Sequence, residues 1–427
     1  MSSSAALGYR CTVCRRDYSF DEVSYTCPAD GGNLDVLLDY KAISRASSPK
    51  AIGESRDESI WRYLSLLPVE DPGLHGTALR AVGWTPLLSP PLLAAELGLR
   101  RLWLKDDGRN PTASFKDRAS AVAVARARQV GAEVVVTAST GNAGAALAGM
   151  AAAAGMPAVI LAPRTAPPAK VAQLLMFGAR VLLVDGSYDQ AFDLTLEAAR
   201  EFGWYCRNTG YNPFTAEGKK TAAFEIWEWA MRIGSEGGNF NLQIGAEFLS
   251  RLSVFVSVGD GNIISGIHKG FKDLQALGWI ERLPRLFGVQ AEGSAAIANA
   301  FNAGTENIAA VSASTLADSI SVDLPRDGVR AIRAARETGG DYILVSDQGI
   351  LTSIAELGSV GIFAEPAGAA SYAGLVAALK AGLTGPHEPV LVINTGSGLK
   401  DIRAAMAAAS QADVIEPTLE AVKRVLE

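Results

Sequence analysis

The chain has 427 residues, of which 48% are apolar and 20% charged, and this is the composition of a globular protein large enough for two or more domains. The net charge of −6 argues against nucleic acid or an anionic membrane surface as the main partner, although a small anionic ligand needs only local positive potential. The N-terminal residues lack a basic stretch followed by an apolar core, and the uncharged, Ala- and Gly-rich run 145–163 contains Gly155 and Pro157. We therefore expect no signal peptide, no membrane span and a cytoplasmic location.

Residues 1–40 are predicted to form a small module of their own that is similar to a zinc ribbon. Cys11 and Cys14 have the spacing of one ribbon knuckle, and Cys27 stands in a second knuckle where Asp30 replaces the usual fourth cysteine. A carboxylate oxygen can ligate zinc, so these four residues are a candidate metal site. A ribbon that folds without metal is the equal alternative. Clustered cysteines of this kind indicate a reducing compartment rather than a secreted disulfide framework.

The next segments are short and irregular. Residues 41–55 are polar and are expected to form a linker, and 58–68 are expected to form an amphipathic helix ending at Pro68. Short strands are expected to begin at Trp84 and Leu102.

From residue 117 onward, helical and strand-like patterns alternate, which predicts an α/β fold with parallel-rich sheets. The helices are expected at 117–130, 145–154, 169–177 and 188–202, and from Ile264 and Lys400. The strands are expected at 133–138, 158–161, 181–184, 254–258, 286–290 and 390–394.

Lys116 follows a short polar loop and directly precedes the first of these helices. An amine that is desolvated between a loop and a helix N-terminus has its protonated form disfavoured, which favours attack on a carbonyl and imine formation. A solvated helix start is the alternative interpretation of the same residues.

Three glycine-rich turns stand where a strand meets a helix, at 139–144, 259–263 and 395–398. The first offers Ser139, Thr140 and Asn142 and suits a carboxylate, because backbone N–H groups at a helix N-terminus attract anions. The second suits a phosphate. In the third, Thr395 or Ser397 could face a heteroaromatic nitrogen. The glycine spacing of the second turn is not the dinucleotide fingerprint, and 217–221 does not satisfy the Walker A pattern. Each turn could also be a turn without a ligand.

Taken together, residues 114–118, 139–144, 217–221, 258–262, 365–370 and 395–401 resemble the threonine synthase family. More broadly, they resemble the fold type II (tryptophan synthase β-like) pyridoxal-phosphate enzymes. The resemblance spans about residues 80–410. It implies a large cofactor-binding domain (41–116 and 211–427), a small mobile domain (117–210), pyridoxal 5′-phosphate as cofactor and a homodimer. The implied reaction converts O-phosphohomoserine and water to L-threonine and phosphate.

The resemblance also implies roles for individual residues. Lys116 would be the Schiff-base lysine, whose amine then moves protons at the substrate carbons. Ser139 and Thr140 would hold the substrate carboxylate, and Lys105 would contribute to substrate binding. The other implied contacts are to the cofactor: Phe115 beside its ring, Asn142 at its phenolic oxygen, Gly259, Asp260, Gly261, Asn262 and Ile263 at its phosphate, and Thr395 at its pyridine nitrogen.

One position departs from the family pattern. Thr215 stands where the family commonly has an arginine that binds the substrate phosphate, and such a charge-assisted contact is worth about 1.5–3 kcal/mol. Lys105, Arg109, Lys219 or Lys220 could compensate. Otherwise the substrate is phosphoserine or a related amino acid, as in cysteate synthase, diaminopropionate lyase or serine/threonine dehydratase. A ligand-sensing protein that keeps the fold is the non-enzymatic alternative.

Overall fold

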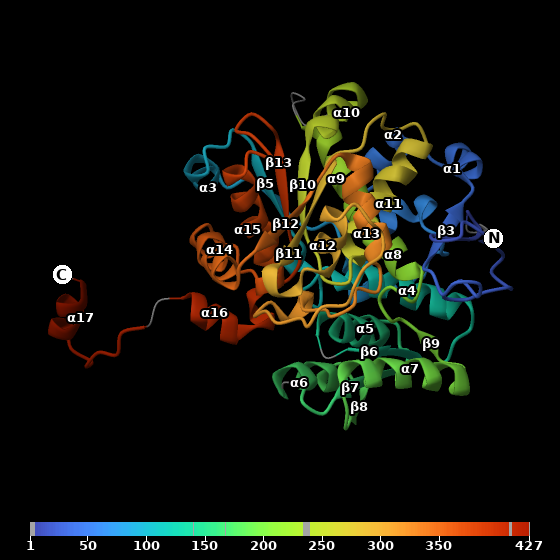
Figure 1. Ribbon diagram of the computed structural model, residues 1–427, viewed down its shortest axis with the longest axis horizontal. Helices are drawn as coiled ribbons and strands as arrows, with labels where there is room; N and C mark the ends of the chain where they lie inside the picture. Colours follow the sequence, from blue (N-terminus) through green and yellow to red (C-terminus); the bar gives the residue numbers. More distant parts are fainter. Residues whose placement is uncertain (1–4, 140, 167, 234–239, 410–411, 427) are drawn as a thin grey trace.

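A computed structural model describes residues 5–139, 141–166, 168–233, 240–409 and 412–426. Two α/β layers form the body of the molecule, the N-terminal module lies against one side, and helix α17 (Leu419–Leu426) stands apart from the body (Figure 1). No helix in the described part of the chain has both the length and the apolar character needed to cross a membrane.

The larger sheet has six strands in the order β12-β11-β10-β13-β5-β4, and only β4 runs antiparallel to its neighbour. Its central strands are buried along their whole length because helices cover both faces. The strands are β4 (Leu87–Leu88), β5 (Leu102–Asp106), β10 (Ser253–Ser257), β11 (Arg285–Ala291), β12 (Tyr342–Val345) and β13 (Val390–Asn394).

The helices that pack on or beside this sheet come mostly from the second half of the chain. Helix α15 lies across β10 to β13, and α11 and α13 contact β10 and β11. The helices are α3 (Pro91–Glu96), α8 (Phe214–Lys219), α9 (Thr221–Arg232), α10 (Leu242–Arg251), α11 (Asn262–Ala276), α12 (Ala296–Asn302), α13 (Gly328–Thr338), α14 (Asp347–Ser359), α15 (Pro366–Lys380) and α16 (Ile402–Ala408).

The smaller sheet has four parallel strands in the order β8-β7-β6-β9, and helices α5 and α7 pack against β6 and β7. Helix α4 (Lys116–Gln129) packs against both α5 and α8, and so joins the two layers. The remaining elements are β6 (Val135–Ala138), α5 (Asn142–Ala153), β7 (Ala158–Pro163), α6 (Pro168–Met176), β8 (Arg180–Val184), α7 (Tyr188–Phe202) and β9 (Tyr205–Cys206).

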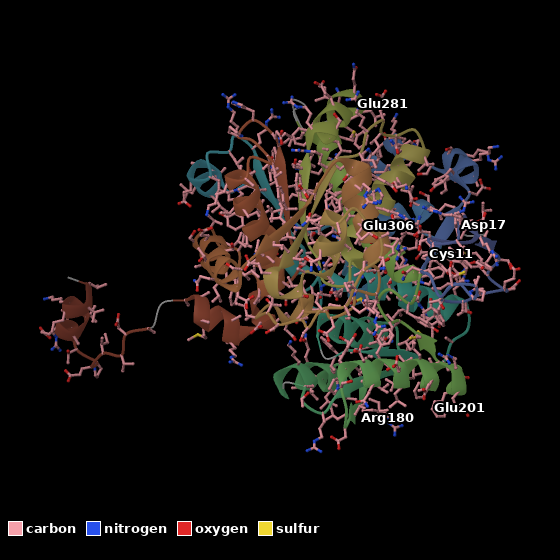
Figure 2. All side chains as sticks on the ribbon, viewed as in Figure 1. Cys11, Asp17, Arg180, Glu201, Glu281 and Glu306 are labelled. Carbon is pink, nitrogen blue, oxygen red and sulfur yellow. The ribbon has the colours of Figure 1, made fainter. Side chains whose placement is uncertain are left out.

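The N-terminal module is a three-stranded antiparallel sheet in the order β2-β1-β3, made of β1 (Ala6–Cys11), β2 (Asp17–Tyr18) and β3 (Leu34–Leu38). It packs closely on the body. The Tyr25 ring stacks on Tyr211 with centroids 4.7 Å apart, and the Asn33 amide donates to the Arg326 carbonyl at 3.0 Å. Figure 2 shows Cys11 and Asp17 on this side of the molecule, and Arg180 and Glu201 on the small-sheet side.

The predicted α/β fold is confirmed, and several expected elements match closely, among them strand 390–394 and helix 188–202. The linker expected at 41–55 is wrong, because α1 (Tyr40–Ala46) and α2 (Pro49–Gly53) occupy it. Asp39 and Ser48 cap these two short helices.

Two further expectations need correction. The helix expected at 58–68 is a 3₁₀ helix, η1 (Ile60–Leu66). The strand expected at Trp84 begins three residues later as β4, because the positive φ of 50° at Trp84 interrupts extended backbone. All four strands of the smaller sheet fall within 117–210, but movement of that segment stays a prediction.

Candidate active site

A cavity of about 480 Å³ lies between the two sheets, where the carboxyl ends of β6, β10 and β13 meet. Ligands of open α/β sheets commonly bind at such strand ends. Its lining includes Lys116, Ser139, Asn142, Lys219, Asp260 and Thr395. The cavity therefore brings together residues that are up to 279 positions apart in the sequence, from Lys116 to Thr395.

Lys116 is the first residue of α4, one position earlier than the sequence predicts, and the loop before it is tightly held. The backbone N–H of Thr112 donates to the Asp117 carboxylate at 2.6 Å, and the Phe115 N–H donates to the Thr395 carbonyl at 2.9 Å. Ala113 has a positive φ of 65°, a backbone conformation that costs energy and is often found at functional sites. These contacts fix the Lys116 backbone at the edge of the cavity.

Burial lowers the pKa of Lys116, and the positive charge of Arg207 lowers it further. Both effects favour the neutral amine, which is the nucleophilic form and the form able to accept a proton.

Arg207 is a residue that the sequence analysis missed. Its side chain is fully buried, with Nε donating to the Ser120 hydroxyl at 3.1 Å and Nη1 donating to the Thr209 hydroxyl at 2.8 Å. No described residue accepts a hydrogen bond from Nη2. Desolvation lowers the pKa of Arg207 to about 10. A buried guanidinium without a carboxylate partner is costly, and it adds positive potential next to the cavity.

The turn 259–263 has the properties of an anion site. No residue in the described ranges accepts a hydrogen bond from the backbone N–H groups of this turn, which leads into the 15-residue helix α11. Gly261 has a φ of 89°, and a Cβ there would lie 2.7 Å from the Ala331 Cβ and 2.8 Å from the Asp327 carbonyl oxygen. Only glycine fits, and the free N–H groups suit a phosphate.

The other predicted residues of the cavity form two polar groups. Thr395 directly follows β13 and Ser257 ends the neighbouring strand β10, and their hydroxyl oxygens are 3.4 Å apart. In the second group, the Asn142 amide donates to the Glu365 carboxylate at 2.7 Å, and Ser139 accepts from the Gly141 N–H at 3.2 Å. Burial raises the pKa of Glu365. Thr140 lies outside the described residues.

Phe115 is fully buried, and it is absent from the described lining of the cavity. Its ring lies beside the Arg118 guanidinium, 5.4 Å from the ring centroid. The sequence therefore indicates the right loop, but the structure places Lys116, not Phe115, at the cavity surface.

The four cations proposed to compensate for Thr215 have different surroundings. Lys105 does not line the cavity: its ammonium donates to Glu225 at 2.6 Å. Lys220 is paired with Asp273 at 2.8 Å, and Arg109 is largely exposed beside Asp106.

Lys219 alone among these four lines the cavity. It is fully buried and donates to the Asn262 side-chain oxygen, and it forms no ion pair with any described carboxylate. Desolvation lowers its pKa well below the usual lysine value.

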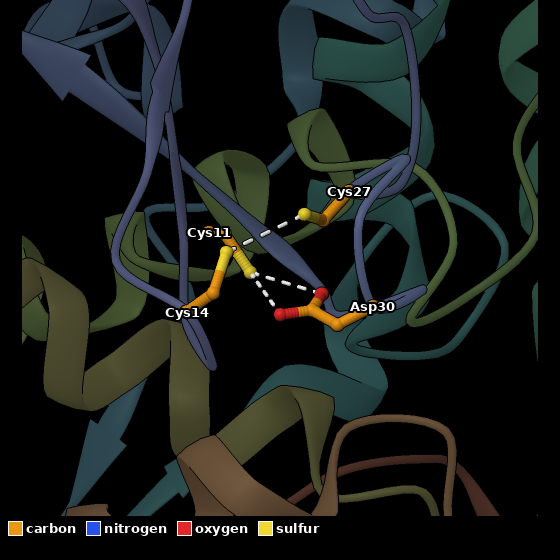
Figure 3. Close-up of side chains that lie close together, drawn as sticks. All are labelled: Cys11, Cys14, Cys27 and Asp30. Carbon is orange, nitrogen blue, oxygen red and sulfur yellow. Dashed lines mark hydrogen bonds between the residues drawn. The ribbon is translucent and has the colours of Figure 1, made fainter.

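In the N-terminal module, the proposed metal ligands converge (Figure 3). The ligand atoms of Cys11, Cys14, Cys27 and Asp30 all lie within 4.8 Å of one another. The Cys14 and Cys27 sulfurs are 3.6 Å apart, and tetrahedral Zn–S bonds of about 2.3 Å place two sulfurs about 3.8 Å apart. The donor set and spacing therefore fit zinc.

Comparison with known proteins identifies the family. The family model "Pyridoxal-phosphate dependent enzyme" matches residues 78–396. The chain belongs to this family. Threonine synthase of Methanocaldococcus jannaschii is 37% identical over 421 residues, covering 98% of this chain and 99% of the relative. Threonine synthase of Methanosarcina acetivorans is 36% identical over 420 residues, covering 98% of both chains. The Mycobacterium leprae threonine synthase is 34% identical, covering 80% of this chain and 88% of the relative.

Solved structures show the same fold at lower identity. The processed form of threonine deaminase isoform 2 from Solanum lycopersicum has a TM-score of 0.64 at 22% identity, covering 84% of this chain and 90% of that one. Diaminopropionate ammonia lyase from Escherichia coli has a TM-score of 0.62 at 20% identity, covering 76% and 86%. The predicted fold type II architecture and dependence on pyridoxal phosphate are thus confirmed.

Proposed function

We propose that this pyridoxal-phosphate enzyme is a threonine synthase, which converts O-phosphohomoserine and water to L-threonine and phosphate. The observation that carries the proposal is the near full-length similarity to two threonine synthases. The cavity supports it, because it contains a buried lysine with a lowered pKa, an anion-binding turn and a second lysine that forms no ion pair with any described carboxylate.

The residues present fit the cofactor. The free N–H groups of 259–263 would hold its phosphate, and Thr395 would meet its ring nitrogen. When bound, pyridoxal phosphate stabilises negative charge that develops on substrate carbons. A neutral hydroxyl at the ring nitrogen does not hold that nitrogen protonated, in contrast to a carboxylate, and so favours elimination and replacement over transamination.

The protein groups can then move protons and hold the substrate. Burial and the positive charge of Arg207 lower the pKa of Lys116 and so favour its neutral amine, which would take a proton from one substrate carbon and return it to another. Ser139 and the turn that follows it would hold the substrate carboxylate at the N-terminus of α5.

Lys219 is our candidate for the substrate phosphate, in place of the arginine that Thr215 replaces. A phosphate dianion would stabilise the charged ammonium and so raise the pKa of Lys219 again. Lys105 is not retained in this role, because its ammonium is already paired with Glu225.

The decisive experiment incubates the holoenzyme separately with O-phosphohomoserine, O-phosphoserine, serine and diaminopropionate. We expect threonine and phosphate in equal amounts from the first substrate alone. Phosphate without threonine would contradict the proposal. The Lys116→Ala variant is the control: it should lose the visible absorbance of bound cofactor and all turnover. A wild-type protein that stays colourless after reconstitution would exclude the cofactor assignment.

The absence of the usual arginine favours one alternative. Thr215 is fully buried, and its hydroxyl donates to the Asn212 carbonyl at 2.7 Å, so it is not available to a substrate phosphate. This alternative is a β-elimination or β-replacement on phosphoserine. Its side chain is one carbon shorter than that of phosphohomoserine, so its phosphate would lie closer to the cofactor. Pyruvate or a β-substituted product from phosphoserine would support this alternative. A ligand-sensing protein without turnover would bind substrate and form no product.

We also propose that the N-terminal module holds zinc through Cys11, Cys14, Cys27 and Asp30. Three thiolates and one carboxylate would fill all four positions of a structural zinc site, and the four ligand atoms lie within 4.8 Å of one another. Elemental analysis of protein purified without chelator should find one zinc per chain. A zinc-free protein with unchanged thermal stability would contradict this.

The assembly and location remain proposals of the same kind. We propose a homodimer in the cytoplasm, which light scattering and cell fractionation would test. We also propose that the small domain closes over the substrate. Two ion pairs between this domain and the large domain would hold the closed state, Lys170–Asp318 and, at 2.8 Å, Asp189–Arg326.

A further inference from the structure

A continuous line of side chains joins the N-terminal module to the anion-binding turn. Asp35 on β3 accepts a hydrogen bond from Arg330 Nη1 at 2.6 Å. The same guanidinium donates to both oxygens of Asp327, at 2.6 and 2.7 Å. Asp327 in turn accepts from the Asn262 amide at 2.6 Å. Asn262 begins α11 and lines the cavity, so the module reaches the cavity in three contacts.

Backbone contacts reinforce this line. The Asp327 N–H donates to the Asp260 carbonyl at 2.9 Å, and the Arg326 N–H donates to the Asp260 carboxylate at 3.2 Å. Asn33 of the module donates to the Arg326 carbonyl at 3.0 Å. The segment 326–327 therefore contacts both the turn and the N-terminal module. Asn33 bonds this segment directly, and Asp35 bonds it through Arg330.

The line also fixes the orientation of an amide inside the cavity. Because Asn262 Nδ2 donates to a carboxylate, its Oδ1 faces Lys219, which donates to it, and lies 3.3 Å from the Thr215 hydroxyl oxygen. A loosened Arg330 would free Asp327, and with it the Asn262 amide and the Lys219 ammonium. Asp327 is fully buried, whereas the Asp35 side chain is 35% exposed, so Asp35 is the member that can be changed with least disturbance to folding.

We propose that Asp35 is a positioning residue for the active site. Through Arg330, Asp327 and Asn262 it holds the turn 259–263 in the geometry that binds the cofactor phosphate. The N-terminal module is thus a structural part of the cofactor site. The proposal rests on the proposed role of this turn, and its test uses no substrate, so it stands apart from the choice of reaction.

The test is Asp35→Asn in the full-length chain. Titration of the apoprotein with pyridoxal phosphate, followed by visible absorbance, should show a dissociation constant roughly threefold to thirtyfold weaker, the range for residues coupled through a network. Asp17→Asn is the matched control, because Asp17 belongs to the same module and pairs with the exposed Arg10 at its outer side (Figure 2). It should change the constant less than twofold. Asp35→Glu keeps the charge and should recover most of the affinity.

A second background separates positioning from general loss of stability. In an Asn262→Ala protein, adding Asp35→Asn should weaken cofactor binding no further, because the line is already broken. The same loss in both backgrounds would overturn the proposal, and so would an Asp35→Asn protein whose affinity stays within twofold of wild type. A wild-type chain that binds no pyridoxal phosphate would instead refute the cofactor assignment itself.

Discussion

Lys219 offers the sharpest test of how this enzyme recognises its substrate. Lys219→Gln removes the charge but keeps a side-chain donor for Asn262. A hydrogen bond between an ammonium and a phosphate is worth about 1.5–3 kcal/mol, and every 1.4 kcal/mol is about tenfold. We therefore expect kcat/KM for O-phosphohomoserine to fall roughly tenfold to 150-fold.

The pH dependence of substrate binding tests the role of Lys219 independently. Because desolvation lowers the pKa of Lys219, the amine of the free enzyme loses its proton as pH rises through that lowered value. Substrate binding that needs the ammonium should therefore weaken with rising pH, and the Gln variant should lack this alkaline loss. Folding follows the same linkage. Lys219 binds its proton more tightly in the unfolded chain than in the folded one, so the free energy of unfolding rises with pH. The Gln variant has no charge to bury and should be at least as stable as wild type.

The assay compares kcat/KM, the cofactor dissociation constant and thermal unfolding in one set of proteins. Lys272→Gln is the control, since Lys272 is a half-exposed lysine on α11 that pairs with Glu337 at 2.9 Å. A kcat/KM within twofold of wild type would refute the reasoning. A cofactor affinity that falls by the same factor as kcat/KM would show that Lys219 serves the cofactor phosphate instead.

Three further outcomes are expected. Glu225→Gln leaves Arg118 and Lys105 buried without their shared carboxylate, so urea unfolding should show a loss of about 3–5 kcal/mol, and a loss below about 1 kcal/mol would contradict this. Burial alone would raise the pKa of Glu225, but the two cations lower it to about 2. The stabilisation of the fold by the Glu225 carboxylate is therefore fully present above the unfolded pKa of about 4.3 and is lost as pH falls towards 2. The Gln variant should lack this part of the acid dependence of stability. Arg207→Gln should raise the pKa of Lys116 and move the pH dependence of cofactor binding to higher pH, and an unmoved profile would exclude Arg207 as a cause. Asp30→Ala should weaken zinc retention in a chelator competition, whereas Asp17→Asn should not.

The sequence predicts those parts of the site that depend on short, local patterns. The loop before Lys116 and the turn 259–263 each combine small residues with a strand end and a helix start, and the structure places both at one cavity. Strand 390–394 is a continuous apolar run, so its bounds are predicted correctly. Strand β12 is not predicted, although Gly339 and Gly340 end the helix before it, because Tyr342–Val345 is only four residues long.

Which cations are free to bind a ligand could not be predicted from local patterns. Lys105 and Lys219 are both fully buried lysines, and sequence gives no reason to prefer either. The difference is Glu225, 120 positions from Lys105, which neutralises Lys105. Arg207 was missed for the same reason, because the absence of an ion pair with any described carboxylate is visible only once its neighbours are placed in the fold.

This pattern of pairing explains how an acidic protein can bind two phosphate-bearing molecules at one site. Burying a cation without a partner costs folding free energy, so most buried cations here have carboxylate partners, as Arg118 and Lys220 do. Lys116, Lys219 and Arg207 form no ion pair with a described carboxylate, and all three have lowered pKa values. These three buried positive groups thus lie in or next to the cavity, while the net charge of the chain stays at −6. An anion that enters relieves a cost already present in the empty fold, so binding energy and specificity arise from the same unpaired charges.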